Sequence, residues 1–122
     1  MTKSEALQAW FSKFLTAYPV SSVPDDAVFP WLTYELVTGG WGDGENSINV
    51  NLWYYTESEA IPDAKAQEMS KAIGLGGVII QCDDGAIWIK RGSPWCQRIK
   101  DDADANVKRR YINISVEYFT EN

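Results

Sequence analysis

Apolar and polar residues alternate along two stretches of the chain, residues 47–55 and 107–119. The even-numbered positions 48 to 54 and 112 to 118 are apolar, and this period of two predicts β-strands with one face on a core. The opposite face should be wetter, yet it also carries aromatic residues: Trp53, Tyr55, Tyr111 and Phe119. A small domain rarely needs aromatic residues on both faces of a sheet. We therefore predict that another copy of the chain covers this second face.

The N-terminal part has the pattern of an amphipathic helix followed by a strand and a loop. Apolar residues recur at three- and four-residue steps between positions 7 and 18, namely Leu7, Trp10, Phe11, Phe14, Leu15 and Tyr18. Thr2 and Glu5 predict a capping box at the helix start, and Pro19 is expected to end the helix. A strand is predicted over residues 31–38. The glycine-rich residues 39–46 are predicted to form a flexible hairpin loop.

Trp41 lies at the tip of this loop, and two interpretations of it remain open. An exposed tryptophan on a mobile loop favours contact with some apolar surface. In the first interpretation the ring folds back onto its own sheet. In the second it docks on a neighbouring molecule.

A second helix and further strands are predicted in the rest of the chain. Thr56 and Glu59 suggest another capping box, before a helix over residues 59–73 that ends at Gly74. Its buried side is predicted to comprise Ile61, Ala64, Met69, Ala72 and Ile73. Residues 77–81 and 86–90 should form a hairpin around residues 83–85, and a last strand should start near Lys108. Residues 95–100 are ambiguous, and residues 101–106 read as a polar loop.

These elements predict a single α+β domain spanning residues 1–122. The expected sheet is mainly antiparallel with four to five strands, and both helices pack on one face. A chain of 122 residues with 45% hydrophobic residues can bury one core, which excludes a disordered protein. No apolar run approaches the ~20 residues that cross a bilayer, and residues 1–5 lack an apolar signal core. We expect a soluble protein made in the cytoplasm, with no membrane partner.

The charge distribution leaves two interpretations open. A net charge of −6 argues against general nucleic-acid binding, which relies on cations that neutralise phosphates. The basic residues nevertheless gather in the C-terminal third: Lys90, Arg91, Arg98, Lys100, Lys108, Arg109 and Arg110. They form either a solvated, charge-balanced loop region or the interface or lumen of a ring in which copies meet through opposite charges.

No set of residues in the sequence predicts catalysis or metal binding. Histidine is absent, which removes the commonest general base and metal ligand. Cys82 and Cys96 lack a C-x-x-C pattern, so two reduced thiols are expected. Ser93 and Cys96 have no partner base. We therefore expect no enzyme and no cofactor.

Two weaker signals point to ligands. Residues 102–106 copy the first half of a calcium-binding loop, but Val107 and Asn113 stand where that loop needs Gly and Glu. A solvated turn is therefore the expected structure. The chain also has six tryptophans, which leaves a carbohydrate-binding module as an alternative function.

Several strings of residues, in this order of elements, resemble one family. They are Phe29-Pro30-Trp31-Leu32-Thr33-Tyr34-Glu35, Ile48-Asn49-Val50-Asn51-Leu52-Trp53-Tyr54, Gly85-Ala86-Ile87-Trp88-Ile89-Lys90-Arg91-Gly92-Ser93-Pro94-Trp95 and Arg109-Arg110-Tyr111-Ile112-Asn113-Ile114-Ser115-Val116-Glu117-Tyr118. The chain resembles the tail terminator proteins of long-tailed bacteriophages and prophages, also described as minor capsid or tail completion proteins. The likeness extends from the first predicted helix to the last strand.

The resemblance implies a small α+β protomer that assembles into a six-membered ring. Such a ring caps the growing tail tube, stops polymerisation of the tube protein and presents a surface to the head connector. The implied location is the head–tail junction of a virion assembled in a bacterial host. The implied partners are other copies of the chain, the tail tube protein and the head connector protein, and DNA passes through the ring without specific binding. The family has no catalytic residues to carry over.

The residues expected to make these contacts are Trp41, Asp43 and Glu45 in the loop, Trp53 and Tyr55 on the wetter face, and Arg91, Arg109 and Arg110 on the charged side. A charge swap at Arg109 and Arg110 is predicted to weaken assembly while the fold stays intact. The alternatives are a head-closure or adaptor connector subunit, a carbohydrate- or ligand-binding module, and a cryptic enzyme.

Overall fold

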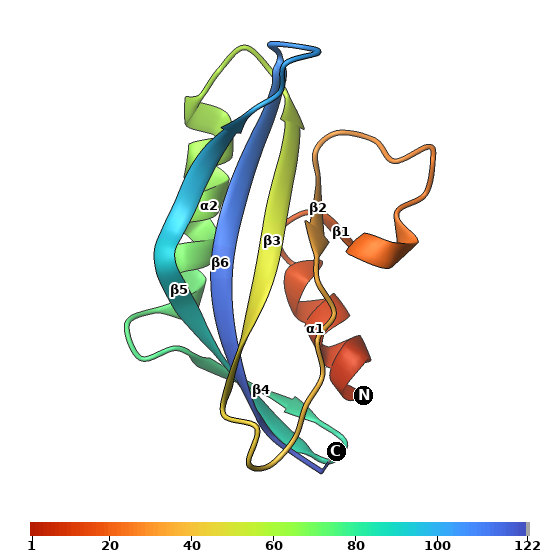
Figure 1. The fold of residues 1–122 in the computed structure, drawn as a ribbon, viewed down its shortest axis with the longest axis vertical. Coiled ribbons are helices and arrows are strands. Elements are labelled where there is room, and N and C mark those ends of the chain that lie inside the picture. Colours follow the sequence, from red (N-terminus) through yellow and green to blue (C-terminus); the bar gives the residue numbers. More distant parts are fainter. Residues whose placement is uncertain (122) are drawn as a thin grey trace.

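The computed structural model describes residues 1–121, which form two helices and a six-stranded sheet. The elements are α1 (Lys3–Phe11), β1 (Thr16–Pro19), a short 3-10 helix (Val20–Ser22), β2 (Trp31–Tyr34), β3 (Glu45–Tyr55), α2 (Ala60–Ile73), β4 (Val78–Cys82), β5 (Gly85–Lys100) and β6 (Val107–Phe119). The strand order is β1-β2-β3-β6-β5-β4 (Figure 1). Every neighbouring pair is antiparallel except β1 and β2, which are parallel. The predicted α+β class is confirmed, with one strand more than expected.

The first helix is shorter than its apolar pattern predicts. The capping box is confirmed, because the Glu5 amide donates to Thr2 Oγ1 and the Thr2 amide donates to Glu5 Oε1. The helix ends at Phe11, however, and residues 16–19 form the added strand β1. The apolar period outlasts the helix because Phe14, on the turn that follows, still packs edge-on against Trp10 at 5.0 Å. Pro19 therefore lies at the end of a strand.

The hydrophobic core lies between the two helices and one face of the sheet. The predicted alternation of β3 and β6 is confirmed: the even-numbered residues 48–54 and 112–118 are buried, together with Ile87 and Ile89 of β5. Leu7 and Phe11 of α1 and Met69 of α2 join the same core. Both helices therefore cover the same face of the sheet. Figure 1 shows α2 behind the long strands β5 and β6.

The second helix differs from its prediction in its buried face and its cap. The buried residues are Pro62, Ala66, Met69, Ser70 and Ile73, whereas the predicted Ile61, Ala64 and Ala72 are exposed. The second capping box is absent. Thr56 Oγ1 accepts from the Ser58 amide instead, and the Glu59 carboxylate lies against arginines of the sheet. The predicted stop at Gly74 is confirmed, since its φ of 75° is one that glycine adopts readily.

The strand boundaries shift in three places. β2 ends at Tyr34, so residues 35–44 leave the sheet before β3 begins at Glu45. The ambiguous residues 95–100 continue β5 after an irregularity between Arg91 and Cys96. The hairpin turn at residues 83–84 and the polar loop before β6 are both confirmed.

The two edge strands of the curled sheet both contact α1. Helix α1 packs against β1 at one edge and against β4 at the other. The Asp83 amide after β4 donates to the Met1 carbonyl at 2.7 Å, which ties the start of the chain to the β4 edge. Within residues 1–121, neither helix has the length and apolar content needed to cross a bilayer.

Candidate interaction surfaces

The face of the sheet opposite the helices presents the odd-numbered residues of β3 and β6, and we call it the open face. Opposite one another across these two strands lie Asn49 and Asn113, and Asn51 and Tyr111. Ser47 and Ser115 extend this polar row toward the β3 start. These side chains are half-buried or exposed. The even-numbered residues of the same two strands, in contrast, are buried in the core. The middle of the open face is therefore a belt of neutral hydrogen-bonding groups.

An aromatic cluster lies at one end of this belt. Trp31 and Trp53 stack with ring centroids 6.1 Å apart, and Phe29 lies 4.4 Å from Trp31 and 5.7 Å from Tyr55. The Arg109 guanidinium lies 5.1 Å from the Trp53 ring centroid, within the range of a cation–π contact. Because Tyr55 is exposed, this cluster offers a partner both an apolar surface and a cation.

A second aromatic cluster lies at the other end of the open face. The Phe119 ring is 5.4 Å from Trp41 and 6.3 Å from Trp88. Lys90 Nζ lies 4.0 Å from the Trp88 ring centroid and pairs with the Glu45 carboxylate. The first interpretation of Trp41 is therefore confirmed, and contact with a neighbouring molecule stays a prediction. Its ring folds back onto its own sheet, yet the side chain stays 62% exposed and available to a neighbour.

Backbone hydrogen bonds position the loop that carries Trp41. The Trp41 amide donates to the Thr120 carbonyl at 2.8 Å, and the Gly40 amide donates to Asp43 Oδ2 at 2.8 Å. The Tyr118 hydroxyl donates to the Val37 carbonyl, and burial raises the pKa of Tyr118 to about 12. The first part of the loop is therefore anchored to Tyr118 and Thr120 at the end of β6, and the Gly40–Asp43 bond closes a turn within the loop.

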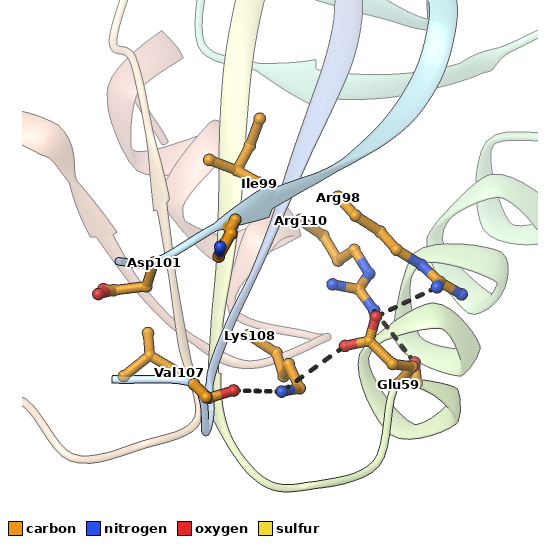
Figure 2. A pocket seen from close by; sticks show the side chains of 9 residues that line it. Glu59, Arg98, Ile99, Asp101, Val107, Lys108 and Arg110 are labelled. Atoms are coloured by element: carbon orange, nitrogen blue, oxygen red, sulfur yellow. Dashed lines mark hydrogen bonds and ion pairs between the residues drawn. The ribbon is translucent and has the colours of Figure 1, made fainter. Parts of the chain in front are cut away.

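Charged residues gather on the other face of the sheet, where α2 meets β5 and β6 (Figure 2). Arg110 is only 1% exposed, and its Nε donates to Asp63 Oδ1 at 2.7 Å. Arg98 pairs with Asp63 at 2.6 Å and with Glu59 at 3.1 Å. Lys108 lies 3.8 Å from Glu59. Burial alone would raise the pKa of Asp63, but the hydrogen bonds from Arg110 and Arg98 outweigh it and hold that pKa below its usual value.

Beside this ion-pair cluster is a cavity of about 330 Å³. Its wall includes Glu59, Arg98, Lys100, Lys108 and Arg110, and Figure 2 shows Glu59 pointing between the cations. The wall carries four cations against two carboxylates, those of Glu59 and Asp101, and the neighbouring Asp63 and Asp102 supply two further carboxylates that pair with these cations. The cations on this side of the molecule are paired within the protomer, but they lie on strands β5 and β6, so the predicted loop is wrong. The interface or lumen of a ring stays a prediction.

The residues predicted to make contacts lie on different surfaces of the structure. Trp41 and Glu45 lie at one end of the open face, and Trp53, Tyr55 and Arg109 lie at the other. Asp43 is exposed in the loop. Arg91 is on the helix side, where its Nη1 donates to Ser70 Oγ at 2.9 Å. Arg110 is also on the helix side and buried, so its placement on a common charged surface with Arg109 is wrong.

Several residues of the two clusters were not among the predicted contacts. Phe29 and Trp31 complete the first cluster, and Trp88, Lys90 and Phe119 complete the second. The alternation of β6 predicts Phe119 on the open face, although Phe119 was not among the predicted contacts, and the same count would have assigned Arg110 to the core face. The strand pairing that brings Trp31 opposite Trp53 leaves no comparable signal in the sequence.

Of the two potential nucleophiles on β5, Ser93 is exposed and Cys96 is half-buried. Burial raises the pKa of the Cys96 thiol, which favours the protonated, unreactive form. In the described part of the chain, no group of three or more acidic or cysteine side chains is arranged to hold a metal ion. Comparisons of the chain with protein-family models, curated proteins and solved structures found no match.

Proposed function

We propose that the protein is a tail terminator of a long-tailed bacteriophage or prophage that acts as a homo-oligomeric ring. The observation that carries this proposal is the open face, which holds an aromatic and charged cluster at each end and is covered by neither helix of residues 1–121. Exposed aromatic residues beside charged groups are typical of surfaces that bind other proteins. The resemblance of the sequence to tail terminators supplies the kind of assembly.

The proposed mechanism is steric. One surface of the ring matches the last ring of the tail tube, and the other surface supports no further tube subunits and receives the head connector. The open face and the loop around Trp41 make contacts within the ring or with the tube. DNA passes through the ring, and a chain with net charge −6 has little general affinity for it.

Negative-stain imaging tests this function directly. The purified protein is mixed with its tail tube protein under conditions in which tubes elongate. A terminator shortens the tubes and leaves a distinct ring at one end of each. Tubes that grow to the same length with and without the protein, and carry no ring, would refute the proposal.

Two alternatives give different results in accessible experiments. A head-closure or adaptor subunit of the same junction would leave tube growth unaffected and bind the head connector. A carbohydrate-binding module is favoured by the exposed ring of Trp41 beside Phe119. In that case, glycans would quench tryptophan fluorescence, and a Trp41→Ala variant would lose that response.

A further inference from the structure

Leu75 is the most exposed large apolar residue of the described chain. Its side chain is 98% exposed, in the loop that joins α2 to β4. The loop has a defined shape, because the Trp88 indole donates to the Gly76 carbonyl at 2.9 Å. Gly77 lies so close to Trp88 that an added Cβ would be 2.5 Å from the indole nitrogen. A held loop that projects one leucine into solvent presents an apolar knob that its own fold does not cover.

An apolar groove lies elsewhere on the molecule, between α1 and the strands β1 and β2. Its volume is about 480 Å³, and its lining includes Met1, Glu5, Ala9, Pro19, Tyr34 and Leu36. Leu36 is itself partly exposed at this site. Ser4 and Gln8 also line the groove, but most of its exposed surface is apolar, and its volume is large enough for a leucine side chain.

The charges beside the knob and the groove are opposite, because the N-terminal ammonium of Met1 at the groove is already paired with the Asp83 carboxylate. Lys71, in the last turn of α2 before the knob, is exposed and forms no ion pair within residues 1–121. Glu5 at the groove accepts a hydrogen bond from the Thr2 amide, which lowers the pKa of its carboxyl and keeps it ionised. A leucine in the groove therefore brings a cation toward a carboxylate, which favours this pairing in this orientation.

The knob and the groove lie on different sides of the protomer. In Figure 1 the loop that follows α2 is at the lower left, whereas α1 and β1 are at the right. Two different patches that complement each other form a head-to-tail contact, which repeats from copy to copy and closes into a ring if the rotation permits. We propose that Leu75 of one copy inserts into the α1–β1–β2 groove of the next copy. This inference rests on the proposed ring, for which it names one contact.

The test uses two variants that each remove one half of the contact. Leu75→Ser removes the knob, and Ala9→Arg fills the groove. Each variant alone should self-associate about 10- to 100-fold more weakly than wild type in sedimentation velocity, as expected from the loss of one buried leucine. Mixed together, they retain one intact knob and one intact groove, so they should form a 1:1 heterodimer and nothing larger.

Ile61→Ser is the matched control, because Ile61 is 52% exposed at the opposite end of α2 from the knob. It should associate as wild type does. Circular dichroism confirms that each variant is folded. The proposal is overturned if the wild-type chain stays monomeric at its highest soluble concentration, if Leu75→Ser associates as wild type does, or if the mixture yields no heterodimer.

The tube assay separates this contact from the proposed function. If the Leu75→Ser protein still shortens tubes and forms terminal rings, the contact between Leu75 and the groove is refuted and the terminator function stands. Wild-type protein that assembles through the knob but leaves tube growth unchanged would refute the terminator function while the contact stands.

Discussion

Arg109 and Arg110 are consecutive residues of β6, and their side chains lie on opposite faces of the sheet. Arg110 points toward α2, where Asp63 and the Glu59 carbonyl accept its hydrogen bonds at 2.7 and 3.1 Å. Arg109 points to the open face, where its Nε donates to Asn51 Oδ1 at 2.7 Å and its guanidinium lies over Trp53. Arg110 is compensated by carboxylates, whereas Arg109 has only neutral neighbours within ion-pair distance among residues 1–121.

The difference separates residues that hold the fold from residues that are free for partners. A charge removed from water needs an opposite charge and hydrogen bonds, and the helix side supplies both to Arg110. A half-exposed arginine stacked on a ring keeps its charge available at little cost to the protomer. The ion pairs beneath α2 therefore contribute to stability, whereas Arg109 on the open face keeps a cation available to a partner.

The sharpest test of this comparison is Arg110→Met. The substitution keeps an apolar stem but leaves the Glu59 carbonyl with the Asp63 amide as its remaining donor and Asp63 without one of its two cations. We expect the free energy of unfolding to fall by about 3 kcal/mol, the lower end of the range for a broken buried pair, because Asp63 is partly exposed. Urea denaturation followed by circular dichroism measures this change.

Arg109→Met is the matched control for that experiment. It removes a neighbouring arginine of the same strand, and the free energy of unfolding should change by less than about 1 kcal/mol. Equal losses in the two variants would show that the two faces do not differ as described.

A smaller effect is expected from the ionisation of Asp63. Its pKa is below the usual value in the folded protein, so the ionised carboxylate contributes stability at neutral pH. That contribution is present above the unfolded pKa of about 4 and is lost as the pH falls through the folded pKa. Because Asp63 is partly exposed, we expect it to be less than about 1 kcal/mol.

Urea denaturation of the wild type and of Asp63→Asn from neutral pH to about pH 3 measures this contribution. The difference in stability between the two proteins should be constant at neutral pH and should narrow below about pH 4. A difference that stayed unchanged down to pH 3 would mean that the arginines do not stabilise the ionised form.

The sequence predicts the two faces of the long strands because each residue's parity decides its side. The alternation of β3 and β6 assigns Ile112 and Ile114 to the core, and the same count assigns Arg110 to the core face and Arg109 to the open face. Arg110 departs from the predicted charged surface because consecutive residues of a strand point to opposite faces of the sheet. Charge type alone does not indicate which side of a strand a residue occupies.

Other features depend on contacts between distant residues. The apolar period of α1 continues to Tyr18, although the helix ends at Phe11, because a turn and a strand place apolar side chains on the same core. Glu59 fits a capping pattern with Thr56, but Arg98 and Arg110 from the sheet compete for its carboxylate. Local sequence gives no information on such competition, since the arginines are about forty to fifty residues away.

Arg109→Glu should have the smallest effect on the stability of the protomer. It should have the largest effect on assembly through the open face. The side chain is half-exposed and has no carboxylate partner to lose, so the free energy of unfolding should change by less than about 1 kcal/mol. The reversed charge lies beside the Trp53 ring, where a carboxylate is repelled by the negative face of the π-system. Sedimentation velocity with and without the tube protein should therefore show weaker assembly than Arg109→Lys, which keeps the charge. Full assembly of Arg109→Glu at wild-type stability would exclude this end of the open face from the interface.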